Sequence, residues 1–125
     1  MIYTKDSNYK VKFYRDSKKE NSPALDYLEK LNQKEKTKIL KYIEFLRLSN
    51  GYLDEPYSKH IKGKIRELRV DFGHNRHRIF YFTFISRTII LLNGFLKKTE
   101  KTPLAEIKKV EAYLVDVLQN KKMYE

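Results

Sequence analysis

The chain has 125 residues and a mass of 15.1 kDa, enough for one domain with a real hydrophobic core. Its 41% hydrophobic and 14% aromatic residues argue against intrinsic disorder, although 34% of residues are charged. The absence of cysteine excludes disulfides, thiol nucleophiles and cysteine-based zinc sites. Because no apolar run suits a membrane span or a signal peptide, we expect one cytoplasmic domain over residues 1–125, with no membrane partner.

Positive charge is concentrated in the second half of the chain. The formal net charge is +11, and residues 57–101 contain 11 Lys and Arg against 3 Asp and Glu, a net +8. The remaining residues carry 16 basic against 13 acidic side chains, a net +3. Clustering of this kind favours a surface that binds a polyanion such as nucleic acid. The alternative is a solvated basic face without a ligand.

The N-terminal half predicts one strand and two helices. Residues 9–16 alternate apolar and lysine side chains, as in an edge or half-buried strand. Ser22 followed by Pro23 is typical of a helix start, with Ser22 as the N-cap residue. Asn32 with Glu35 has the spacing of a capping box and predicts a second, longer helix.

The C-terminal half predicts a three-stranded meander. Residues 64–72, 77–85 and 88–96 are rich in β-branched and aromatic side chains and are joined by segments of hairpin length. The last two strands are apolar at both parities, which predicts central positions in the sheet.

Thr102 and Pro103 open a final helix. Its predicted apolar stripe consists of Leu104, Ile107, Val110, Leu114 and Val117. The element order is therefore β-α-α-β-β-β-α. We expect an α+β fold: an antiparallel β-sheet with two N-terminal helices packed on one face and a C-terminal helix beside it.

The first meander strand presents charged residues opposite its core side. Leu68 and Val70 share one face, so Glu67 and Arg69 point to the other. Arg78 begins the next strand just past the turn and is expected near Arg69. Glu67 is expected to pair with a basic neighbour and hold its rotamer. An arginine on a sheet surface is, on its own, equally compatible with simple solvation.

Lys97 and Lys98 follow the third meander strand, which neighbours the second. Cations from three adjacent strands are thus expected at one end of the sheet, near the N-terminus of the last helix, where anions bind well. His74 and His77 flank a turn without a third ligand, so a charged turn is favoured over a metal site. His60 is a candidate proton carrier near the basic strand. No glycosidase carboxylate pair, glycine-rich phosphate loop or nucleophile elbow is found.

Three segments resemble one known family. They are KIRELRVDFGHNRHRIFYF, IILLNGFLKKTEKTPLAEI and VKFYRDSKKENSPALDYLEKL. Together they resemble the RelE/HigB superfamily of bacterial toxins, in its phage-derived HigB-like branch. That branch shows an E-L-R strand, an R-x-F-Y-F strand and the element G-F-x-K-K-T-x-K-T-P before the last helix. The resemblance covers nearly the whole chain.

The resemblance implies the toxin of a type II toxin–antitoxin system that inhibits translation and arrests growth. Such a toxin is a metal-independent, ribosome-dependent endoribonuclease, an mRNA interferase, without a cofactor. The ribose 2′-OH attacks the adjacent phosphate and leaves a 2′,3′-cyclic phosphate or 3′-phosphate. The implied partners are mRNA, the ribosome and a cognate antitoxin in a hetero-oligomeric complex. That antitoxin would be a small helix-turn-helix, HigA-like protein. The alternative is a non-catalytic RNA- or ribosome-binding module using the same basic patch.

The resemblance also implies roles for particular residues. Arg69, Arg78, Lys97 and Lys98 are the catalytic candidates, and which lysine touches the scissile phosphate stays open. A lysine crowded by other cations has a lowered pKa, so Lys97, Lys98 or Lys64 is a candidate for proton transfer. Seven further residues are expected to contact RNA: Lys59, Lys62, Lys64, Arg66, Arg76, Tyr81 and Phe95. Tyr81 and Phe95 are candidates for base stacking, with a place in the sheet core as the alternative.

The chain departs from RelE at one position. RelE has a tyrosine at its C-terminal end, where this chain offers Leu104 and Ile107, with Tyr113 further along. The general base is therefore not assigned from the resemblance.

Overall fold

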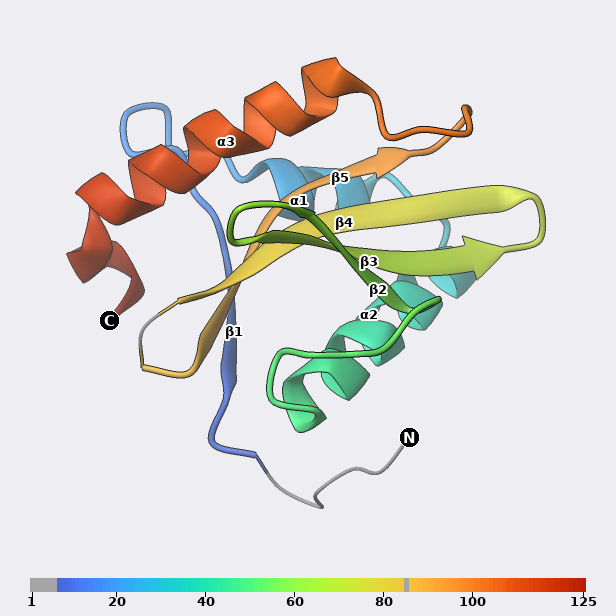
Figure 1. The fold of residues 1–125 in the computed structure, drawn as a ribbon, viewed down its shortest axis with the longest axis horizontal. Coiled ribbons are helices and arrows are strands. Elements are labelled where there is room, and N and C mark those ends of the chain that lie inside the picture. Colours follow the sequence, from blue (N-terminus) through green and yellow to red (C-terminus); the bar gives the residue numbers. More distant parts are fainter. Residues whose placement is uncertain (1–6, 85) are drawn as a thin grey trace.

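The computed structural model describes residues 7–84 and 86–125 (Figure 1). The elements in chain order are β1 (Lys10–Phe13), α1 (Pro23–Glu29), α2 (Gln33–Leu48), β2 (Ser58–Lys62), β3 (Ile65–Phe72), β4 (Asn75–Phe84), β5 (Thr88–Leu96), α3 (Leu104–Gln119) and the 3-10 helix η1 (Lys121–Tyr124). The predicted α+β class is confirmed. Ile85, the last residue of one predicted strand, lies outside the described residues.

The sheet has five strands in the order β1-β5-β4-β3-β2. Strands β2 to β5 form an antiparallel meander, and the two apolar strands β4 and β5 are central, as predicted. Two features differ from the expectation. The short edge strand β2 was not foreseen, and β1 pairs with β5 in parallel, with Lys10 facing Thr88. The sheet is therefore mixed rather than wholly antiparallel.

Helices cover both faces of this sheet (Figure 1). On one face, α1 and α2 bury apolar residues such as Leu28 and Ile39 against Leu68, Ile79 and other strand residues. On the opposite face, α3 packs its buried valines on side chains from the central strands. The last helix thus covers the second face of the sheet, opposite the two N-terminal helices. Strand side chains that point to one face of the sheet consequently pack in one hydrophobic core, and those that point to the other face pack in a second core.

The predicted helix starts are present, with one difference in chemistry. Asn32 caps α2, and its side-chain oxygen accepts the Glu35 backbone N–H at 2.9 Å. Ser22 occupies the N-cap position of α1, but its hydroxyl donates to the Tyr14 carbonyl at 2.7 Å instead of capping. In α3, Leu104 does not belong to the buried stripe, because it is 64% exposed.

Gly94 allows α1 to approach the sheet closely. A Cβ atom at this position would lie 2.6 Å from the Tyr27 ring, a distance that real contacts do not show. The small residue in β5 therefore lets the Tyr27 ring sit directly on the strand. Among the described residues, no helix is both long and apolar enough to cross a membrane.

Candidate phosphate-binding site

Strand alternation places a row of charged residues on the α3 face of β3. Leu68 and Val70 face α2 in the core, as predicted, so Glu67, Arg69 and Asp71 point to the opposite face. Arg69 is directly opposite Arg78 in the ladder with β4. The expectation that these two arginines are neighbours is confirmed.

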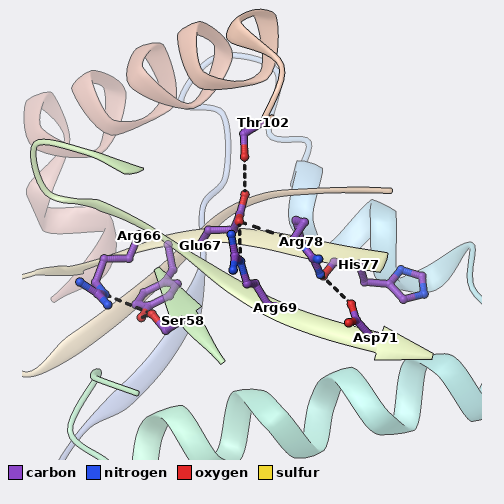
Figure 2. Close-up of polar contacts among 9 residues, drawn as sticks. Ser58, Arg66, Glu67, Arg69, Asp71, His77, Arg78 and Thr102 are labelled. Carbon is purple, nitrogen blue, oxygen red and sulfur yellow. Dashed lines mark hydrogen bonds and ion pairs between the residues drawn. The ribbon is translucent and has the colours of Figure 1, made fainter. Parts of the chain in front are cut away.

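Glu67 lies at the centre of this cluster and is fully buried (Figure 2). One carboxylate oxygen accepts a hydrogen bond from Arg69 Nε at 3.2 Å and lies 3.9 Å from Arg78 Nε. The other oxygen accepts the Thr102 hydroxyl at 3.0 Å. This carboxylate therefore fixes the Arg69 side chain and joins the segment before α3 to the sheet. Its pairing with a basic neighbour agrees with the expectation for Glu67.

Arg78 is buried but its guanidinium is only partly satisfied. Its Nη1 donates to Asp71 Oδ1 at 2.9 Å and to the His77 carbonyl at 3.0 Å. Its Nε has no hydrogen-bond partner within the described part of the chain. A buried donor without a partner is costly, and this Nε lies 3.9 Å from the Glu67 carboxylate, beyond hydrogen-bond distance.

Lys97 and Lys98 occupy different environments. Lys97 is 9% exposed, and its backbone N–H donates to the Arg76 carbonyl at 2.9 Å. Burial lowers the pKa of Lys97, and the positive charges of Arg69, Arg78 and Arg76 lower it further, against the opposing effect of Glu67. Lys98 is exposed. The geometry therefore places Lys97, and not Lys98, within the arginine cluster.

A pocket of about 190 Å³ opens beside the two arginines. It is lined by Lys38, Tyr42, Pro56, Tyr57, Arg69, Asp71 and Arg78. Sequence reasoning did not single out the residues from α2 and from the loop before β2. A tyrosine after proline in a polar loop was the only local signal, and nothing in the linear sequence links that loop to Arg69. The link is the Arg69 backbone N–H, which donates to the Tyr57 carbonyl at 2.8 Å.

Two of the residues expected to contact RNA are core residues instead. Tyr81 is fully buried under the N-terminal helices, and its hydroxyl lies 2.7 Å from the Ser58 hydroxyl. Its ring has no free face for a nucleobase, so the expectation that a base stacks on Tyr81 is wrong. Phe95 is also largely buried, and its ring stacks on Phe80 at a centroid distance of 5.3 Å.

The basic residues around β2 lie apart from the cluster. Lys59, Lys62 and Lys64 are exposed, and Lys62 forms an ion pair with Glu111 at 3.3 Å. Lys64 precedes Arg69 by five residues, roughly 16 Å along an extended strand.

Arg66 points to the α2 face of the sheet. Its Nε donates to the Ser58 hydroxyl at 3.1 Å, and its guanidinium lies 4.9 Å from the centre of the Tyr52 ring. His60, the candidate proton carrier, lies 2.8 Å from the Gly63 carbonyl in the β2–β3 turn. Tyr113 stacks on Tyr14 at 4.7 Å, beneath the C-terminal half of α3.

His77 belongs to a buried network on the other face. Its Nδ1 lies 2.6 Å from the Tyr27 hydroxyl, and its Nε2 lies 2.9 Å from Glu35. The other Glu35 oxygen accepts from Asn75 at 2.7 Å. The H-N-R-H segment is thus not simply a charged turn, because its second histidine joins β4 to α1 and α2. In the described ranges, no three His, Asp or Glu side chains are grouped to hold a metal ion.

Comparison with known proteins identifies the class of this chain. The chain is an α+β domain that gathers two arginines and the buried Lys97 near one carboxylate, and the family model that it matches belongs to the RelE/HigB toxin-like group. Residues 26–114 match the family model described as Phage derived protein Gp49-like (DUF891), and the chain belongs to this family, which is part of that group. The matched segment contains the arginine–carboxylate cluster, Lys97 and the residues lining the pocket. No curated protein matches the chain.

Proposed function

We propose that the protein is a ribosome-dependent endoribonuclease that cleaves mRNA and inhibits translation. Membership of a toxin family points to an RNase toxin and implies a cognate antitoxin. The observation that carries the proposal is the cluster of Arg69, Arg78 and Lys97 around the buried Glu67. A solubility surface would leave such cations in water, whereas a pentacovalent phosphorane requires several fixed donors at one point.

The reaction balances without an external reactant. The ribose 2′-oxygen forms a bond to the adjacent phosphorus as the bond to the 5′-oxygen breaks, giving a 2′,3′-cyclic phosphate and a free 5′-hydroxyl. Arg69 and Arg78 donate to the non-bridging oxygens as negative charge develops. One proton leaves the 2′-hydroxyl and one reaches the 5′-oxygen. Lys97 is the candidate for one of these transfers, because burial brings its pKa below that of an ordinary lysine.

The same positive charge accounts for the proposed partners. With a formal net charge of +11, the protein is attracted to the ribosome and its bound mRNA. We propose that a small helix-turn-helix, HigA-like antitoxin forms a hetero-oligomer with the toxin and covers the basic face. Exposed lysines such as Lys59, Lys64 and Lys98 then serve as phosphate contacts that do not take part in the chemistry.

Induced expression followed by mapping of mRNA 5′ ends tests the proposal, in cells and in a purified system with and without ribosomes. We expect new 5′ ends that require ribosomes for the wild type, and their loss for Arg69→Ala. Arg15→Ala is a matched control, since Arg15 is exposed and its side chain donates to the nearby Glu20 carbonyl, while its backbone bonds to Tyr124 do not depend on the side chain. Growth arrest without new 5′ ends would instead identify a non-catalytic RNA- or ribosome-binding module.

A further inference from the structure

Tyr57 is an exposed aromatic residue attached directly to the arginine cluster. Its side chain is 40% exposed, and its carbonyl accepts the Arg69 N–H at 2.8 Å. This backbone bond holds the Tyr57 loop against the free edge of β3, beyond the last residue that pairs with β2. The backbone of Tyr57 is therefore held next to Arg69.

The pocket beside Tyr57 has the size and lining of a site for a single planar ring. Its volume of about 190 Å³ is below the roughly 300–1,000 Å³ of pockets that hold drug-sized ligands. Tyr42 and Pro56 supply apolar surface, and Tyr42 meets Tyr57 edge-on at a centroid distance of 6.2 Å. Arg69 and Arg78 supply charge to the same pocket. Apolar aromatic surface beside cations matches a nucleotide, which pairs a flat base with a phosphate.

Tyr57 differs from Tyr52, the other strongly exposed tyrosine among the described residues. Tyr52 is 57% exposed, but the Arg66 guanidinium already lies over its ring at 4.9 Å. Among the described residues, no cation lies over the Tyr57 ring, whose aromatic contact is the edge-on one with Tyr42. Within the described part of the chain, the face of the Tyr57 ring thus carries neither a stacked ring nor a cation.

We propose that Tyr57, supported at its edge by Tyr42, is the stacking platform for one nucleobase next to the phosphate that Arg69 and Arg78 bind. This inference rests on the proposed RNA-cleaving function and assigns it a base subsite. Stacking positions the base, and the backbone bond from Tyr57 to Arg69 sets the distance from the base to the phosphate. Tyr57 is accordingly a positioning residue, and the reacting atoms are contacted by the cations.

Binding of an uncleavable RNA tests the subsite independently of catalysis. The probe is a short RNA with a 2′-O-methyl group at the attacking position and 2-aminopurine on either side of the scissile phosphate. Matched probes carry an abasic residue at the same positions. We expect the wild type to bind one intact probe about tenfold more tightly than its abasic counterpart, and to quench the 2-aminopurine fluorescence by stacking.

Three variants identify the residue responsible. Tyr57→Ala should remove both the preference for the intact probe and the quenching, while Tyr57→Phe should keep both because it retains the ring. Tyr52→Ala, which removes an exposed tyrosine outside the pocket, should bind as the wild type does. Unfolding by urea checks that Tyr57→Ala is folded. The subsite is wrong if intact and abasic probes bind the wild type alike, or if Tyr57→Ala retains the preference.

The two proposals fail in different ways. If the wild type cuts ribosome-bound mRNA but Tyr57→Ala cuts it at an unchanged rate and binds both probes as the wild type does, the subsite fails and the nuclease stands. If the wild type prefers the intact probe through Tyr57 but produces no new mRNA ends, the nuclease fails and the base subsite stands.

Discussion

The two faces of the sheet bury polar groups in opposite ways. On the face of α1 and α2, His77 has a partner at each ring nitrogen, and Glu35 accepts a hydrogen bond at each carboxylate oxygen. On the face of α3, the Nε of the buried Arg78 lacks a hydrogen bond, and Lys97 Nζ makes no ion pair with any described residue. The His77–Glu35 network is therefore paired within the protein, whereas the cluster on the second face leaves donors without a partner among the described residues.

We interpret this contrast as one between structural polar groups and the groups of the proposed site. A fully paired network contributes to stability and specifies how the helices dock. A group of unsatisfied cations lowers stability, and a protein retains such a group where a bound anion compensates. The difference therefore makes opposite predictions for substitutions on the two faces.

The largest effect is expected for Arg78→Ala. Removing one positioned donor from a developing phosphorane should reduce the cleavage rate by about 10²- to 10³-fold. Arg78→Lys should recover little, because it keeps the charge but loses the planar fork. Single-turnover cleavage of ribosome-bound mRNA measures the rate, with Arg15→Ala as the control. A rate within threefold (about 0.7 kcal/mol) of the wild type in a folded Arg78→Ala protein would contradict the assignment.

Glu35→Ala should instead lower stability and leave the chemistry intact. The substitution leaves the His77 and Asn75 donors without an acceptor, at a cost of about 1–3 kcal/mol in the free energy of unfolding. Urea denaturation measures this loss. Glu44→Ala is the matched control, because its exposed ion pair with Arg47 should contribute no more than about 1 kcal/mol. A large fall in cleavage per folded molecule would show that the two faces are not separate.

Lys97→Met should raise stability, with a defined pH dependence. The folded-state pKa of Lys97 lies below the unfolded value of 10.5, chiefly because of burial. The unfolded chain therefore binds more protons between the two pKa values, and wild-type stability rises with pH across that window. Below that window the full penalty applies, so the methionine variant should be the more stable protein there. Urea denaturation near neutral pH and above pH 10.5 should show the difference shrinking; a less stable variant at neutral pH would contradict the prediction.

The smallest effect is expected for Lys98→Ala. Because Lys98 is exposed, its removal should weaken RNA binding uniformly and reduce the slope of log K against log salt by about 1. The cleavage rate at saturating substrate should be unchanged, whereas Lys97→Ala should reduce it. Equal rate losses in the two variants would show that both lysines reach the phosphate.

Periodicity in the sequence predicted the helices and central strands but missed the edges. The segment that forms β2, SKHIK, has no apolar alternation, because three of its five residues are exposed at a sheet edge. The residues of β1 do not indicate whether the strand pairs with its neighbour in parallel or antiparallel orientation. The apolar stripe of α3 likewise predicts that this helix packs on the sheet. Because both faces of β4 and β5 are apolar, the stripe does not indicate which face of the sheet α3 covers.

For the candidate site, side-chain alternation along the strands predicted the positions of the two arginines but not which of the two lysines joins them. Alternation along β3 placed Arg69 correctly, and the short turn placed Arg78 opposite it. Alternation along β5 fails, because a bulge inserts Leu92 between the residues that face Tyr81 and Phe80. Counting by twos from Leu92 leads to Lys98, whereas the bulge exchanges the two faces and directs Lys97 into the cluster. Only the observed pairing of β4 with β5 shows which of the two lysines faces the cluster.

The parallel pairing of β1 with β5 also sets an order of assembly during synthesis. Lys10 faces Thr88, 78 positions later in the chain, while each hairpin of the meander closes over a few residues. Contacts so distant in sequence form late, because a long loop must close before they stabilise anything. Strand β1, which leaves the ribosome first, therefore cannot pair until β5 has been made. Lys97 and Thr102 leave the ribosome after β5. A nascent chain thus lacks the complete cluster until most of it has been made, so under the proposed function it is inactive while it is still being translated.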